Sequence, residues 1–170
     1  MRRWAVKLVL VMVMVALSGL VRAETDIKGW GKTKWGMTES ELVGIYAGKI
    51  QKSKVENPAI KMEMKGVKVL GYDFTVQFGF DQNGRLKETI LFPGNDSIST
   101  QGLFSSLEKE LTDKYGKPAY RDKKKSSLGL EFESGWRLSS TSIQLGFLDL
   151  GNASFIKIHY KSRKATDKNL

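Results

Sequence analysis

Apolar and polar residues alternate along several segments of the chain that have the length of a strand. Val76, Phe78 and Phe80 recur at every second position, which predicts a strand with one buried face. Alternation or strand-length apolar runs predict strands at 59–69, 72–80, 86–92, 128–133, 143–147 and 156–160. The pair Asn83-Gly84, between two of these segments, is typical of a hairpin turn. The pattern favours an antiparallel sheet.

Two helices are expected between groups of strands. Thr38 and Glu41 have the spacing of a capping box, which predicts a short helix that frays toward Lys49. The second helix should begin after Ser99 or Thr100 and end at Gly116. Its apolar stripe consists of Leu103, Phe104, Leu107, Leu111 and Tyr115.

One segment of the chain is repeated. Residues 76–80 (VQFGF) and 143–147 (IQLGF) match position by position at an offset of 67, which also places Gly84 on Gly151. Such a repeat suggests two copies of one supersecondary unit. We therefore expect an α+β fold of two tandem α-β-β-β units, at 35–96 and 97–160. They should join edge to edge into one antiparallel sheet with the helices on one face.

The first 23 residues have the layout of a secretory signal peptide. Three cations precede an apolar run at 8–20, and the small residue Ala23 provides a cleavage site. The run of about 13 residues is shorter than the roughly 20 that span a bilayer. The chain has no cysteine for a lipid anchor or a disulfide. We expect a soluble periplasmic or secreted protein without stable membrane insertion, with a flexible lead-in at 24–34 and a basic flexible tail at 161–170.

The chain is basic, with a formal net charge of +10, of which four charges fall in residues 1–23 and +6 remains in residues 24–170, here called the mature chain. Lys123, Lys124 and Lys125 gather after the second helix, in a predicted loop. Such a patch favours an anionic surface or polymer, although it is also typical of a solvated loop. In an exported protein, envelope polyanions are more accessible than nucleic acid, which we do not expect as a partner.

Tryptophan is enriched at binding hot spots, and the mature chain retains Trp30, Trp35 and Trp136. Trp35 precedes a helix cap and should anchor that helix on the sheet. Trp30 lies in a Gly- and Lys-rich segment and is the best candidate for an exposed partner contact. Trp136 lies near a strand end, where both a buried and a partner-binding role remain open.

Few residues suggest catalysis. His159 is the only histidine and should be an exposed strand residue, and no clustered histidines or cysteines are available for zinc. We expect no metal and no cofactor. Glu131 and Glu133 share a strand face at roughly 7 Å, a separation compatible with glycoside hydrolysis. Solvated carboxylates give the same pattern, so a weak hydrolase of envelope polymer is kept only as an alternative.

The predicted order of elements resembles the fold of the beta-lactamase inhibitory protein and of small outer-membrane-assembly lipoproteins. The opening W-G-M-T-x-x-E-L at 35–42 is similar to that of many small bacterial envelope proteins. The chain departs from both groups because it lacks the cysteines of their disulfides and lipid anchors. The resemblance assigns no functional residue. It implies a non-catalytic, protein-binding role in the envelope. The basic patches favour polyanion or membrane-surface binding as the first alternative.

Overall fold

The computed structural model describes residues 26–94, 99–127 and 129–163. The predicted signal peptide at 1–23 lies outside these residues. Within the described ranges, no helix is long and apolar enough to cross a membrane.

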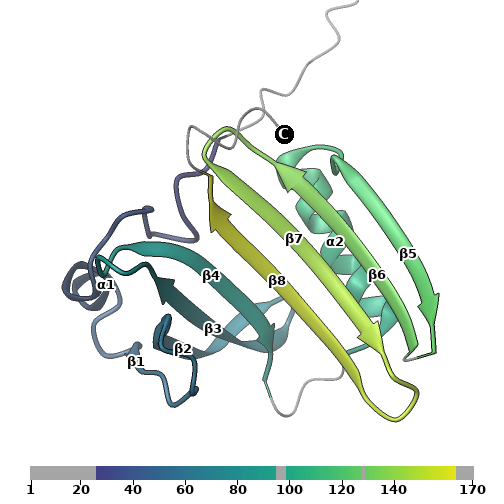
Figure 1. Cartoon of the computed structure of the whole chain (residues 1–170), viewed down its shortest axis with the longest axis horizontal. Coiled ribbons are helices and arrows are strands. Elements are labelled where there is room, and N and C mark those ends of the chain that lie inside the picture. Colours follow the sequence, from purple (N-terminus) through teal and green to yellow (C-terminus); the bar gives the residue numbers. More distant parts are fainter. Residues whose placement is uncertain (1–25, 95–98, 128, 164–170) are drawn as a thin grey trace, which may run out of the picture.

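The described residues form an α+β fold dominated by one antiparallel sheet of eight strands (Figure 1). The strands lie in the order β1-β2-β3-β4-β8-β7-β6-β5. The first half contains α1 (Glu39–Ile45), β1 (Gln51–Lys52), β2 (Ile60–Val69), β3 (Tyr72–Phe80) and β4 (Leu86–Pro93). The second half contains α2 (Gln101–Tyr115), β5 (Tyr120–Ser126), β6 (Gly129–Arg137), β7 (Thr141–Asp149) and β8 (Ser154–Ser162).

Each helix is followed by four strands, so the prediction of three strands per unit is wrong. The two additional strands, β1 and β5, lie at opposite edges of the sheet. β1 has only two residues, and β5 (YRDKKKS) lacks the apolar alternation that marks a half-buried strand. The halves meet where β4 pairs antiparallel with β8. This pairing makes the sheet continuous.

Both helices begin at the predicted caps, α2 ends at the predicted Gly116, and α1 is short and ends at Ile45. Thr38 and Glu41 form the capping box of α1, and Leu42 is fully buried beneath it. The Thr100 hydroxyl caps α2 by accepting the N–H of Leu103 at 3.1 Å. Gly116, with φ of +86°, ends α2 in a conformation that side chains other than glycine rarely adopt.

Helix α2 packs on β6 and β7 through a cluster of aromatic rings. The Phe104 ring lies 5.6 Å from that of Phe132 and 6.2 Å from that of Phe147, between ring centroids. These contacts extend a single apolar core that also contains Leu42 of α1 and Trp136. Burial of these apolar side chains is the main contribution to the stability of the fold.

The lead-in is packed against the sheet over residues 26–34, contrary to the expected flexible segment. The Asp26 carboxylate accepts the N–H and the hydroxyl of Ser140, both at 2.7 Å. The Thr141 hydroxyl, which is fully buried, donates to the carbonyl of Ile27. Buried polar groups require such partners. The apolar side chains of Ile27 and Trp30 also pack against the core. The lead-in was mispredicted because all these contacts are with residues distant in sequence, whereas the prediction considered only local apolar periodicity.

The face of the sheet directed away from α2 is polar, and we call it the open face. Cα partners in register share a face. One such row crosses every strand and consists of Gln51, Glu63, Gln77, Ile90, His159, Gln144, Gly135 and Tyr120. Strand β8 continues to Ser162, so residues 161 and 162, which we expected in a flexible tail, belong to the sheet. The remainder of that tail, 164–170, lies outside the described residues.

Candidate functional site

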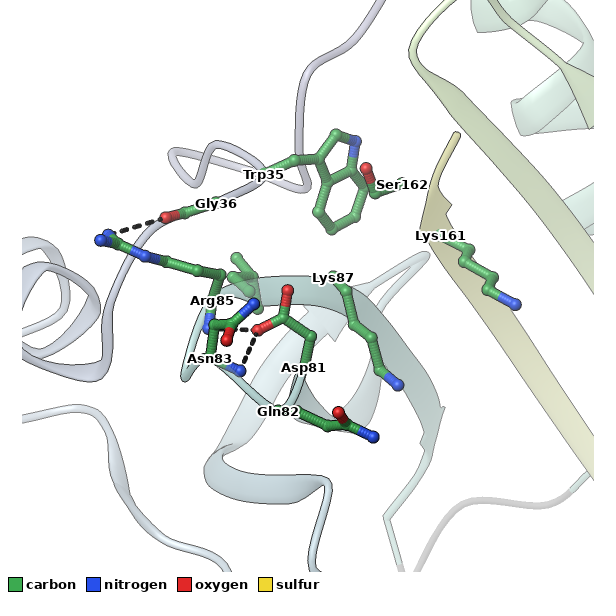
Figure 2. Close-up of a pocket in the computed structure, with 10 residues that line it drawn as sticks. Trp35, Gly36, Asp81, Gln82, Asn83, Arg85, Lys87, Lys161 and Ser162 are labelled. Atoms are coloured by element: carbon green, nitrogen blue, oxygen red, sulfur yellow. Dashed lines mark hydrogen bonds between the residues drawn. The ribbon is translucent and has the colours of Figure 1, made fainter. Parts of the chain in front are cut away.

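A broad hollow of about 840 Å³ opens where the lead-in, the β3–β4 hairpin and the end of β8 meet (Figure 2). We call it the basin. Its lining residues are Trp35, Gly36, Asp81, Gln82, Asn83, Arg85, Leu86, Lys87, Lys161 and Ser162. Segments more than 70 residues apart in sequence therefore contribute to one surface.

The hairpin places Arg85 at the rim of the basin. One carboxylate oxygen of Asp81, Oδ1, accepts the backbone N–H groups of Asn83 and Arg85, each at 2.9 Å. Gly84 supplies the positive φ of +68° that the turn requires. The Arg85 guanidinium lies 3.4 Å from the carbonyl oxygen of Gly36 (Figure 2). The turn thus holds a cation next to the lead-in.

A β-bulge explains how Lys87 joins the same surface. Gly79 is the Cα partner of Glu88, whereas the next residue, Phe80, is the partner of Leu86. Lys87 is therefore the extra residue of a bulge, which changes the direction of a side chain. Lys161 reaches the basin from β8, where it is the Cα partner of Glu88. Figure 2 shows Lys87 and Lys161 on neighbouring strands.

Trp35 forms part of the basin wall and is fixed in orientation. Its indole N–H donates to the Thr141 hydroxyl at 2.7 Å. The N–H of Gly36 donates to the carbonyl of Leu86 at 2.8 Å, which holds the lead-in beside β4. The indole side chain is half-buried against the core, and its remaining surface lines the basin. Its expected role as an anchor of α1 stays a prediction.

The lining is cationic. Arg85, Lys87 and Lys161 carry positive charge, whereas Asp81 contributes the one carboxylate among the lining residues. Lys87 Nζ lies 3.9 Å from Glu88 Oε1, too far for a strong hydrogen bond. Hydrogen bonds from Thr38 and, to a lesser extent, the charge of Arg85 lower the pKa of Glu41. Figure 2 shows the charged ends of these three side chains apart from one another, so the lining favours negative charge at several points of the basin.

Glu88 and His159 form a pair on the open face beside the basin. His159 Nε2 lies 2.9 Å from Glu88 Oε2, and the His159 side chain is 22% exposed. Burial lowers the pKa of His159, and the hydrogen bond to Glu88 partly opposes this shift. His159 is thus partly buried and paired, and the predicted exposed strand histidine is corrected. His159 meets Glu88 because β4 pairs with β8, and this pairing cannot be predicted from a local sequence pattern.

The two tryptophans that we considered as partner contacts differ in exposure. Trp136 is 1% exposed, and its indole N–H donates to the carbonyl of Gly116 at 2.8 Å. Trp30 is half-buried and lies edge-on to Phe78, with 6.1 Å between ring centroids. Trp30 is less exposed than expected because the lead-in around it packs on the sheet, and its role as a partner contact stays a prediction.

The cluster Lys123, Lys124 and Lys125 lies on edge strand β5 and not in the predicted loop. All three side chains are exposed. Lys124 pairs with Asp122 at 2.7 Å, and Lys123 lies 5.0 Å from the centroid of the Phe132 ring. Successive residues of a strand point to opposite faces, so Lys124 lies on the face opposite to Lys123 and Lys125, and the three cations do not all converge on one ligand.

Glu131 and Glu133 lie on the open face and border a hollow of about 200 Å³. The Tyr120 hydroxyl donates to Glu133 Oε1 at 2.5 Å. Burial and then this carboxylate raise the pKa of Tyr120 to about 12. Across the described ranges, no group of three or more histidine, cysteine, aspartate or glutamate residues could hold a metal ion.

The prediction from sequence missed the cations of the basin. The Asn83-Gly84 turn indicated the hairpin, but Arg85 and Lys87 follow it without any motif. Lys161 was placed in the tail. The one available signal was the proximity of two cations to a hairpin turn, which is too common to indicate a site.

No protein-family model matches the chain. No curated protein matches it either. Among solved structures, the chain is similar to a DUF4309 family protein, YjgB, from Bacillus subtilis. The two share 12% sequence identity with a TM-score of 0.45, over 84% of this chain and 89% of that chain. At this identity and score the likeness supports no statement about function.

Proposed function

We propose that this chain is an exported, non-catalytic binding protein whose basin accepts an anionic group of its ligand. One observation carries the proposal: Arg85, Lys87 and Lys161 line a single hollow. The carboxylate of Asp81, which also lines it, already accepts two backbone N–H groups through Oδ1. The lining therefore attracts negative charge.

The three cations would act in different ways. The planar guanidinium of Arg85 can bind a carboxylate or phosphate through two parallel hydrogen bonds. Lys87 and Lys161 carry compact ammonium groups that stabilise charge without a fixed direction. Arg85 and Lys161 are exposed, so salt should screen the attraction strongly.

The exported location remains part of the proposal. It is supported by the cationic start, the apolar run at 8–20 and the cleavage site after Ala23. Periplasmic or secreted proteins meet anionic envelope polymers at high local concentration. The basic mature chain, with a net charge of +6 in residues 24–170, fits such a setting.

A second candidate function is recognition of another envelope protein, the role that the resemblance to inhibitory and assembly proteins implies. It is favoured by Phe155 at the start of β8, which is 55% exposed, and by Leu150 in the preceding turn, which is 40% exposed. Aromatic residues of this kind anchor protein interfaces. Phe155→Ser should abolish capture of a protein partner and leave anion binding unchanged.

We further infer that the two halves are copies of one unit, consisting of a helix and the strands that follow it. The inference is supported by the match of 76–80 with 143–147, which lie in β3 and β7. Each of these strands is third from its own edge of the sheet. Gly84 and Gly151, which follow the two matched segments at the same offset, have φ of +68° and +84°.

The proposal is tested by comparing two variants of the mature chain with equal loss of charge. The basin variant carries Arg85→Gln, Lys87→Gln and Lys161→Gln, and the control carries Lys123→Gln, Lys124→Gln and Lys125→Gln. Binding of labelled polygalacturonate and labelled inorganic polyphosphate is followed by fluorescence anisotropy. The basin variant should bind both probes at least about tenfold more weakly than the control.

Salt and product analysis complete the test. At about 0.5 M salt, where the Debye length is about 4 Å, binding by the unaltered chain should nearly disappear. Equal loss in both variants would overturn the basin as the site. Shortened polygalacturonate chains would support the hydrolase alternative, provided that Glu131→Gln or Glu133→Gln stopped the cleavage.

A further inference from the structure

We propose that the ligand of the basin is an anionic saccharide, a sugar chain bearing carboxylate or phosphate groups, with its ring against Trp35. This inference rests on the proposed anion-binding function and names the chemistry of the ligand. The inference is based on groups in the basin, an aromatic ring and neutral polar side chains, that a purely inorganic anion would not contact.

The first such group is the indole ring of Trp35. Its N–H is already bonded to Thr141, so the ring offers the basin only apolar and π surface. The face of an aromatic ring carries partial negative charge, which attracts the weakly positive C–H groups on one face of a sugar ring. Because hydrogen bonds fix both the ring and the adjoining backbone, the surface is preorganised, and binding orders few groups.

The second group is a set of neutral polar side chains that also line the basin. Gln82 and Asn83 lie beside Arg85 and Lys87, and Figure 2 shows their amide groups at the hairpin. The amides of Gln82 and Asn83 can donate and accept hydrogen bonds, as sugar hydroxyls do. Ser162 adds a hydroxyl beside Trp35. Cations, amides and an indole together match a ligand that has charge, hydroxyls and an apolar face.

An anionic membrane surface fits the basin less well. A flat bilayer makes contact with side chains that protrude from a protein, usually with apolar residues that enter the headgroup region. Here Lys87 is half-buried in the wall of a hollow of about 840 Å³. A slender chain can enter such a hollow, whereas a planar surface cannot reach its floor. The geometry therefore favours the saccharide over the bilayer.

The experiment follows the indole N–H signals of the unaltered mature chain by heteronuclear NMR, assigned with single Trp→Phe variants. The probes are an oligogalacturonate, inorganic polyphosphate of similar charge, and vesicles rich in phosphatidylglycerol. The oligogalacturonate should shift the Trp35 signal and leave that of the buried Trp136 unchanged. Polyphosphate should bind through the cations with little change at Trp35.

Matched variants give a second measurement. Trp35→Leu should weaken oligogalacturonate binding by about two- to tenfold while polyphosphate binding is retained. Trp30→Leu alters a nearby tryptophan that does not line the basin, and it should change the binding of neither oligogalacturonate nor polyphosphate. If Trp35→Leu does not fold, the NMR shift in the unaltered chain decides the question.

The outcomes separate the two proposals. Oligogalacturonate and polyphosphate could both bind through Arg85, Lys87 and Lys161 without any effect at Trp35. This result would overturn the saccharide proposal and leave the proposed anion site intact. If the basin variant, with Arg85, Lys87 and Lys161 replaced by glutamine, still bound both anions as the unaltered chain does, the proposed function itself would be overturned. Binding to vesicles alone would also overturn the saccharide, in favour of a membrane surface.

Discussion

Ile90 of β4 and His159 of β8 are Cα partners at the centre of the sheet, and each has a glutamine of the repeated segment as its other partner. Ile90 is opposite Gln77, and His159 is opposite Gln144. This symmetric register is expected if the two halves are copies of one unit, as proposed above. The repeated segments also match Gly79 with Gly146, but these two glycines have different neighbours.

Gly79→Ala should lower the free energy of unfolding by about 1–3 kcal/mol, because overpacking forces its neighbours to move. A Cβ at Gly79 would lie 2.4 Å from Cγ of Glu88 and would displace the partner of His159. Gly146→Ala is the matched control, since its Cβ would meet nothing closer than Lys157 Cε at 3.6 Å. Urea denaturation measures the free energy of unfolding of both variants. Equal effects at the two glycines would contradict the role assigned to Glu88.

Trp136→Phe should destabilise the fold by about 1–3 kcal/mol and leave anion binding unchanged. The substitution removes the hydrogen bond to the carbonyl of Gly116 and leaves a void in the core. Trp30→Phe, which removes an indole from a half-buried site, should cost less. Denaturant unfolding and anion binding are measured for both variants. A Trp136 variant that is fully stable but fails to bind would return this residue to the candidate site.

The strands that carry alternating apolar residues could be predicted because their pattern is local. Residues 76–80 and 143–147 lie in β3 and β7, and α2 ends at Gly116 as expected. Strand β5 could not be predicted in this way, because its exposed Lys123–Lys125 segment reads as a loop. Its strand conformation depends on hydrogen bonds to β6, which lie beyond any local window.

The basin could not be predicted because its residues meet only through tertiary pairing. Trp35 reaches it through contacts of the lead-in with β4, and Lys161 through the pairing of β4 with β8. Between them in sequence lie more than 100 residues and both helices. Lys87 depends in addition on a bulge that no residue pattern signals.

His159 predicts a dependence of stability on pH. Burial lowers its pKa below the usual 6.5, so the unfolded chain binds the proton more readily than the folded one. Stability should therefore be highest above pH 6.5 and fall as the pH decreases from 6.5 through the lowered pKa. The groups around the ring are Glu88, Lys157 and Lys161.

His159→Gln is the variant that isolates this effect, because a neutral amide does not titrate. Urea denaturation between about pH 7.5 and 5 should show a smaller loss of stability for the variant than for the unaltered chain. Identical pH profiles would show that other groups cause the loss.

The contact between Asp26 and Ser140 predicts that the lead-in opens when its anchor is removed. Asp26→Ala should cost about 1–3 kcal/mol, since two hydrogen bonds to a carboxylate are lost. Hydrogen exchange at residues 27–35 should become faster, and so should exchange of the Trp35 indole N–H. Asp122→Ala is the control, because its ion pair with Lys124 is exposed and contributes little. Unchanged exchange in the Asp26 variant would mean that other contacts suffice to hold the lead-in.

The most direct test of the central claim maps the anion on the unaltered mature chain. Amide chemical shifts are followed by NMR as oligogalacturonate is added at low salt. Binding in the basin predicts that the largest changes cluster at Gly36, Arg85, Lys87 and Lys161, with small changes at Lys123–Lys125 on the edge strand. Changes centred on β5, or scattered over the basic surface, would contradict the account.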